Sequence, residues 1–230
     1  MKMNKVYDLP TRFFHWMFAV AFVGAFIIAK VVDDDSSVYV YHMLLGFILT
    51  FLVLFRLVWG VIGSHYARFS SFQLAPRKLV GYFKQMVRGN TERTAGHNPA
   101  SSWAALIMMG LSLGLAITGV MMVQKINKEF VEEIHELFAN LFLLVSIGHV
   151  LGIFFHTIRH KDNIGLSMIH GRKQDLEVDG IKKNYALVAL ILVLCTGIFG
   201  YQLINGFDAK SGKLEIFGSS LQLGEQEEDD

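Results

Sequence analysis

The stretch EIHELFANLFLLVSIGHVLGIFFH, residues 133–156, carries two separated histidines through a long hydrophobic run. A run of this length can cross the roughly 30 Å hydrocarbon layer of a bilayer as a helix. The 14 residues from His135 to His149 correspond to about 21 Å of rise and nearly four helical turns. We therefore expect the two imidazoles on nearly the same face of one helix, at two different depths.

The rest of the chain has the composition of a membrane protein. Of its 230 residues, 53% are hydrophobic and only 18% are charged, which is a larger apolar share than ordinary soluble domains have. Four further runs approach the ~20 residues that a spanning helix needs. The sequence predicts an all-α integral membrane bundle with five spans, at residues 11–29, 38–62, 103–123, 134–158 and 185–204.

The segments between the spans alternate in charge. The segment before the first span, counted through Arg12, carries +9 together with loop 63–102 and loop 157–184, whereas segments 30–37, 124–136 and 205–230 together carry −9. Cytoplasmic segments of membrane proteins are enriched in Lys and Arg. The prediction is a multi-pass protein of the bacterial cytoplasmic (inner) membrane, with a cytoplasmic N-terminus and a periplasmic C-terminus.

Two more histidines fall at the same two depths. His15 lies about one turn inside the cytoplasmic end of the first span, and His42 about one turn inside the outer end of the second. His15 is expected to face His149, and His42 to face His135. Two imidazoles at each depth, in a dry sleeve of helices, are what two b-type haems need as axial iron ligands. The pattern favours a four-helix transmembrane dihaem bundle plus a fifth C-terminal transmembrane helix.

Other uses of buried histidines stay open at this point. A structural zinc ion needs four protein ligands at one place, and each depth offers two histidines. A proton relay would normally include carboxylates within the membrane, and only Glu136, at the outer rim, is available. The single cysteine, Cys195, lies in the fifth span, and no Cys-x-x-Cys-His motif occurs, so covalent c-type haem attachment is not expected.

Arg56 is a further candidate for cofactor binding. It follows His42 by 14 residues, which places it on nearly the same helix face at the depth of the inner histidine pair. A buried arginine at that depth is costly without an anion, so a haem propionate or a quinone head group could be its partner; snorkelling to the nearby interface is the alternative. Together with His156 and Arg159, Arg56 also forms a candidate quinone site at the cytoplasmic ends of spans two and four.

The long loop 63–102 is predicted to hold one more helix. Pro76 suits the first turn of that helix, and Leu79, Tyr82 and Phe83 recur at helical spacing. This amphipathic segment is expected along the cytoplasmic interface. No glycine-rich nucleotide loop, catalytic serine motif or flavin fingerprint occurs in the sequence, so no catalytic residue is assigned.

Several motifs, in order along the chain, resemble the prokaryotic cytochrome b561 family, which includes the b-type cytochrome subunits of nickel-iron hydrogenases. They are YDLPTRFFHW (7–16), YHMLLGFILTFLVLFRLVWGVIGSHYARFSSF (41–72), GHNPASSWAAL (96–106), IHELFANLFLLVSIGHVLG (134–152) and SMIHGRK (167–173). The resemblance implies a four-helix dihaem b cytochrome that exchanges electrons with quinone, and its ligand positions fall on His15, His42, His135 and His149. The remaining histidines are expected not to bind iron: His65, His97, His156, His160 and His170.

These expectations give a domain plan and a function. Residues 5–173 form the haem-binding domain, 174–204 a cytoplasmic linker and fifth helix, and 205–230 an acidic periplasmic tail. The expected function is an electron carrier of a respiratory chain, embedded in membrane lipid, between the quinone pool and a periplasmic c-type cytochrome or reductase subunit; no nucleic-acid partner is expected. The family that this chain resembles also includes superoxide-oxidising quinone reductases and the membrane anchors of hydrogenase or reductase complexes. Both functions remain alternatives to the electron carrier.

Overall fold

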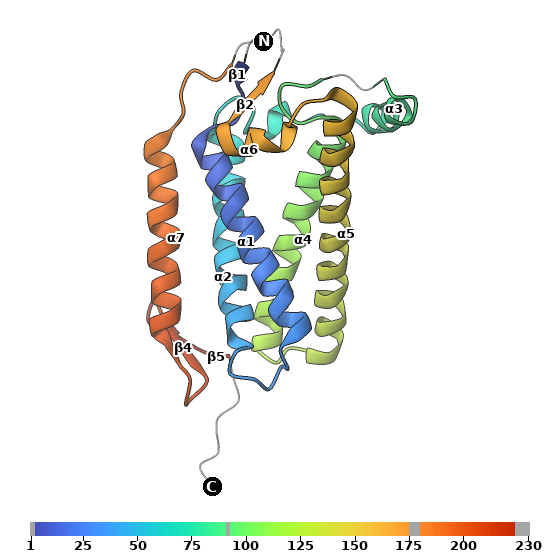
Figure 1. Ribbon diagram of the computed structural model, residues 1–230. Coiled ribbons are helices and arrows are strands. Elements are labelled where there is room, and N and C mark those ends of the chain that lie inside the picture. The colour runs from blue at the N-terminus through green and yellow to red at the C-terminus, as the bar shows by residue number, and fades with distance from the viewer. Residues whose placement is uncertain (1–2, 91–92, 175–179, 224–230) are drawn as a thin grey trace.

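The computed structural model describes residues 3–90, 93–174 and 180–223, and it is mostly helical (Figure 1). The long helices are α1 (Leu9–Val31), α2 (Val40–Ile62), α4 (Pro99–Val123), α5 (Lys128–His160) and α7 (Ala186–Gly206). The shorter elements are β1 (Met3–Lys5), η1 (Phe69–Ser71), α3 (Pro76–Val87), η2 (Ile164–Leu166), α6 (Ser167–His170), β2 (Arg172–Gln174), β3 (Phe207–Asp208), β4 (Lys213–Ile216) and β5 (Ser219–Gln222).

The five predicted spans are confirmed as helices long and apolar enough to cross a membrane. Local signals define where two of them begin. Asp8 caps α1 by accepting a hydrogen bond from the Thr11 amide at 2.8 Å, and Asn98 caps α4 by accepting one from the Ser101 amide at 2.8 Å. Such caps satisfy backbone donors that a helix end leaves without partners.

The helix predicted within loop 63–102 is also present. It is α3, and Pro76 occupies its first turn, where the missing proline N–H costs no hydrogen bond. It packs against α4 near the end of the bundle where the chain begins (Figure 1).

The four helices α1, α2, α4 and α5 form the central bundle, and α7 packs outside it on α1 and α2 (Figure 1). Within the bundle, α1 lies on α2, α4 lies on α5, and α2 contacts α4. Gly114 permits the close approach of α4 and α5, because a Cβ atom there would come within 2.5 Å of the Phe138 ring. Small residues at such crossings are typical of membrane helices.

An aromatic cluster joins α1 to α5 at mid-depth. Phe142, only 2% exposed, lies seven residues from His135 and seven from His149. Its ring centroid is 4.1 Å from that of Phe22 and 5.8 Å from that of Phe18. This packing separates the two histidine levels of α5 with apolar side chains.

The two ends of the bundle differ in their strands. At the end where the chain starts, here called the N-terminal face, β1 and β2 pair antiparallel, with Asn4 opposite Lys173. The opposite end, the C-terminal face, carries the antiparallel sheet β3-β4-β5 next to α7 (Figure 1). The described parts of the predicted cytoplasmic segments lie at the N-terminal face, and those of the predicted periplasmic segments lie at the C-terminal face.

The sheet lies in the segment predicted as an acidic tail, and the sequence pattern did not predict its strands. Phe217 and Gly218, both with positive φ, form the two-residue connection between β4 and β5, the backbone geometry that tight hairpins favour. Leu214 of this sheet packs with Leu203 of α7 and Val40 of α2 in one buried apolar cluster. The final residues of the tail, 224–230, and residues 175–179 of the linker lie outside the described part of the chain.

Candidate functional site

The outer histidine pair is assembled by α2 and α5. The ring centroids of His42 and His135 are 6.2 Å apart, with an angle of 70° between the ring planes. Two imidazoles on opposite faces of one metal ion have centroids about 6 Å apart, because each metal–nitrogen bond is about 2 Å long. The spacing of this pair therefore fits axial ligation of a haem iron.

Hydrogen bonds orient both of these rings. His42 Nδ1 lies 2.9 Å from the Ala25 carbonyl oxygen of α1, which can only accept, so Nδ1 carries the proton. His135 Nδ1 lies 2.8 Å from Thr118 Oγ1, whose single hydrogen is donated to the Gly114 carbonyl at 2.8 Å. Nδ1 of His135 is therefore the donor as well. Each ring keeps the Nε2 lone pair for a metal, and the hydrogen bond at Nδ1 is the arrangement usual for metal-binding histidines.

The surroundings of this pair leave room for a flat group. Gly46 lies one turn after His42, and a Cβ atom at Gly46 would meet no atom within 4 Å. A Cβ atom at Gly119 would lie 3.7 Å from His135 Cε1. No group of three or more metal-ligating side chains occurs among the described residues. The two histidines at this depth are fewer than the four protein ligands of a structural zinc ion, whereas a porphyrin brings its own four nitrogens and needs only two axial ligands.

The two rings of the inner histidine pair lie farther from each other than those of the outer pair. His15 on α1 and His149 on α5 are both half-buried and near enough to interact electrostatically, but their rings make no direct contact in the described structure. The His15 ring packs edge-on against Trp16, with centroids 5.4 Å apart. The donor chemistry fits a second haem, and the pair lies nearer the N-terminal face than His42 and His135 do.

Arg56 lies buried near the inner pair, at 4% exposure. Its Nη2 donates to the Ala67 carbonyl at 2.9 Å, and its guanidinium lies over the rings of Phe69 and Phe72, 5.0 and 5.9 Å from their centroids. Arg56 Nη1 is buried without a hydrogen-bond partner. Asp8 is close enough to interact with the Arg56 charge. Arg56 is therefore not a snorkelling surface residue, and one of its donors remains open to an anion.

His97 also belongs to this region. Burial, with further contributions from the charges of Arg56 and Lys173 and from His149 and His15, lowers the pKa of His97 to about 3. The ring is therefore neutral at physiological pH. No sequence signal gives His97 a role, and only the folded loop before α4 brings it near the inner pair.

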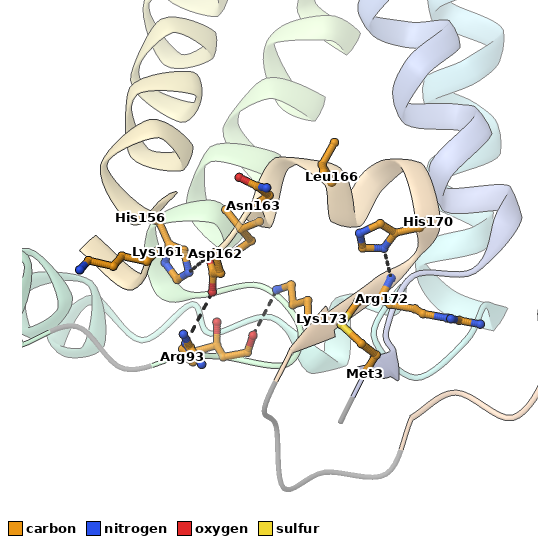
Figure 2. Close-up of a pocket in the computed structure, with 12 residues that line it drawn as sticks. Met3, Arg93, His156, Lys161, Asp162, Asn163, Leu166, His170, Arg172 and Lys173 are labelled. Carbon is orange, nitrogen blue, oxygen red and sulfur yellow. Dashed lines mark hydrogen bonds and ion pairs between the residues drawn. The ribbon is translucent and has the colours of Figure 1, made fainter. Parts of the chain in front are cut away.

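A cavity of about 180 Å³ opens at the N-terminal face beyond the end of α5 (Figure 2). Inside it, His156 Nε2 lies 3.4 Å from Asp162 Oδ1, and Arg93 Nε lies 3.5 Å from Asp162 Oδ2. Lys173 Nζ donates to the Thr94 and Gly96 carbonyls at 3.1 and 2.7 Å. The cavity thus combines a histidine–carboxylate pair with two cationic side chains.

The three residues predicted for a quinone site occupy separate places. His156 lines this cavity, whereas Arg159 donates to the Gly89 carbonyl. The hydrogen bond and ring contacts of Arg56 lie at Ala67, Phe69 and Phe72, in and beside η1. Asp162, which the sequence analysis missed, is the partner that the cavity supplies to His156, and no local sequence signal connects the two.

Helices that cross the membrane around paired histidines at two depths are typical of membrane b-type cytochromes. The family profile described as prokaryotic cytochrome b561 matches residues 6–171. The chain belongs to the prokaryotic cytochrome b561 family and is a multi-pass membrane b-type cytochrome of electron transfer, for which the family implies b-type haem. Neither the search among curated proteins nor the search among solved structures found a match.

Replacing Thr118 by Val should weaken haem binding at the outer pair. The change keeps the shape of the side chain but removes the acceptor of His135 Nδ1–H, and loss of such a partner typically lowers metal affinity by about 10-fold or more. The measurement is the rate of haem loss to an excess of apo-myoglobin, followed by absorbance.

The matched control is Thr118→Ser, which keeps the hydroxyl and should release haem at the wild-type rate. Equal rates for Thr118→Val and the wild type would contradict the role assigned to this hydrogen bond.

Proposed function

We propose that this protein carries electrons across the membrane between quinone at its N-terminal face and a redox protein at its C-terminal face. Two b haems would be held by His15 with His149 and by His42 with His135. The observation that carries the proposal is the outer pair, whose 6.2 Å ring separation and two Nδ1 hydrogen bonds suit axial ligation. Haem b supplies an iron that accepts and gives up single electrons.

The protein's own residues would then set position and access. Ala25 and Thr118 hold the outer rings in the metal-binding tautomer, and Phe142 with Phe18 and Phe22 keeps water out between the two levels. Arg56 offers a buried cation with an unpartnered Nη1 donor, which suits a haem propionate better than a quinone, because a carboxylate carries the charge that compensates a buried guanidinium.

We assign the N-terminal face to the cytoplasm and the C-terminal face to the periplasm of a bacterial cell. The support is the +9 and −9 distribution of charges between the segments and the preference of cytoplasmic segments for Lys and Arg. In this proposal residues 5–173 form the haem-binding domain, residues 174–204 link it to α7, and residues 205–230 form the acidic periplasmic segment. The packing of α7 on α1 and α2 supports treating it as an addition to a four-helix unit.

The quinone would react at the cavity beyond α5. His156 lies seven residues from His149, about 10 Å along the helix. Quinone reduction consumes protons, and quinol oxidation releases them. A histidine beside a carboxylate can transfer those protons, and Asp162 lies beside His156. Arg159 would act indirectly, by holding the Gly89 turn after α3 through its hydrogen bonds.

The C-terminal face favours a basic protein partner. Asp33, Asp34 and Asp35 lie together between α1 and α2, and the tail segment adds further acidic residues. Such a surface attracts a cationic c-type cytochrome and repels a small anion. The alternative of a superoxide-oxidising quinone reductase would need access for superoxide, an anion, and is therefore less well supported; an anchor role in a reductase complex would use the same face.

The purified protein should contain two haems b per chain. The His149→Ala variant and the His42→Ala variant should each keep one haem, because each change removes one ligand from a different pair. The haem kept by one variant should differ in spectrum and potential from the haem kept by the other. A pyridine haemochrome assay per mole of protein gives the count. The proposal fails if the wild type binds one haem or none, or if both variants retain the same single haem.

Replacing His156 by Ala should slow oxidation of a water-soluble quinol analogue by about 100-fold, the lower range for loss of a positioned proton-transfer group. Both haems should remain, because His156 is not assigned as a ligand. Haem reduction by the quinol in stopped flow is the measurement, and His65→Ala, an exposed histidine on another loop of this face, is the control. An unchanged rate in His156→Ala would exclude this cavity as the quinone site.

Electron transfer from the dithionite-reduced protein to a basic c-type cytochrome should slow by roughly tenfold or more between low and physiological salt, because screening removes electrostatic steering. Combined Asp33→Asn, Asp34→Asn and Asp35→Asn replacement, or deletion of residues 225–230, should lower the second-order rate constant at low salt. Arg172→Ala, on the opposite face, is the control. A rate that rises with salt would instead favour a small anionic reactant.

A further inference from the structure

His97 is held in place by its neighbours while its own ring nitrogens make no hydrogen bond in the described structure. The ring packs edge-on against Tyr7, with centroids 5.9 Å apart, and tilted against Phe72 at 4.7 Å. Its Nδ1 is buried and unpartnered. Burying a polar atom without a hydrogen-bond partner costs free energy. The buried Nδ1 of His97 therefore points to a partner from outside the chain.

The main chain around His97 is fixed on both sides. Gln73 Nε2 donates to the His97 carbonyl at 3.2 Å, and the next residue, Asn98, caps α4 and donates to the Tyr82 hydroxyl at 3.1 Å. The preceding Gly96 carbonyl accepts from Lys173 Nζ at 2.7 Å. The backbone position of His97 is therefore set by the loop, and the Tyr7 and Phe72 rings pack against the imidazole.

The charged and titratable groups around His97 are two cations and two histidines. It lies within electrostatic reach of Arg56 and Lys173, both cations, and of His149 and His15, the inner histidine pair. Arg56 Nη1 is a second buried donor without a partner. Asp8, the one buried carboxylate among the described residues, already accepts hydrogen bonds from the Thr11 amide and from Trp59 Nε1. Two buried nitrogens without partners, one of them on the Arg56 cation, lie near a second cation, Lys173, and form a place for an anion at the edge of the inner pair.

We propose that His97 donates a ring N–H hydrogen bond to a carboxylate of the group bound between His15 and His149, next to Arg56. His97 is thus a positioning residue for the propionate side of the inner haem and not an iron ligand. This inference rests on the proposed function, since it requires a haem at the inner pair. The contact would compensate part of the propionate charge, and hydrogen bonding of this kind is one way in which a protein raises a haem potential.

The test is an optical redox titration of wild type, His97→Phe and His97→Gln, each with its haem content counted. His97→Phe keeps a ring for the Tyr7 and Phe72 contacts but has no donor, and it should shift one midpoint to a lower potential. The haem affected should be the one that His149→Ala lacks. His97→Gln keeps an N–H donor and should stay near the wild-type potential. His65→Phe is the control for loss of a histidine from the same face.

A second measurement separates a carboxylate contact from a packing effect. Wild type and His97→Phe are reconstituted with haem b and with its dimethyl ester, which has no carboxylate. The difference in potential between the two proteins should be present with haem b and absent with the ester. If His97→Phe does not assemble, His97→Leu, a smaller apolar side chain, carries the same expectation.

The outcomes also separate this inference from the function on which it rests. A wild type with fewer than two haems overturns the proposed function. A wild type with two haems, whose two potentials are unchanged in His97→Phe or whose shift persists with the ester, overturns only the role of His97.

Discussion

An imidazole inside a membrane must have its N–H group paired, because hydrocarbon offers no hydrogen-bond partner. In the outer pair the two partners come from helices that carry neither histidine: Ala25 of α1 serves His42 of α2, and Thr118 of α4 serves His135 of α5. All four bundle helices therefore meet at one depth. This constraint fixes the tautomer of both rings and leaves each Nε2 available to a metal.

Close packing of the helices arranges the bundle around its two histidine levels. The pairs α1–α2 and α4–α5 pack closely, and Gly114 lets the second pair approach at the Phe138 ring. Between the levels, Phe142 closes the bundle against Phe18 and Phe22. The histidines gather at two depths, and the buried hydroxyl of Ser112 between them is paired with the Met108 carbonyl of its own helix at 2.8 Å.

The two faces carry different chemistry, which gives the proposed electron carrier a direction in space. The N-terminal face has a cavity with His156 beside Asp162 and two cations near them, a setting suited to proton transfer. At the C-terminal face, Lys30 pairs with Glu136 at 3.1 Å on the exposed rim, while Asp33 to Asp35 remain exposed. An exposed ion pair such as Lys30–Glu136 adds little stability. The cluster of like charges at Asp33 to Asp35 creates an electrostatic field that attracts a cationic protein partner.

Periodicity along the chain was sufficient to predict the five spans, the extra helix at Pro76 and the two depths of the histidines, because each depends on spacing within a single helix. Family membership followed from motifs of the same local kind. Tertiary structure alone brought Thr118 to His135, Asp162 to His156, His97 to the inner pair and the Phe69 and Phe72 rings to Arg56. It also formed the strands after α7, where Leu214 packs on Leu203 and Val40. These contacts join residues distant in sequence. They cannot be predicted from periodicity, because helical spacing determines the face of the helix on which a residue lies but not which residue of another element contacts it.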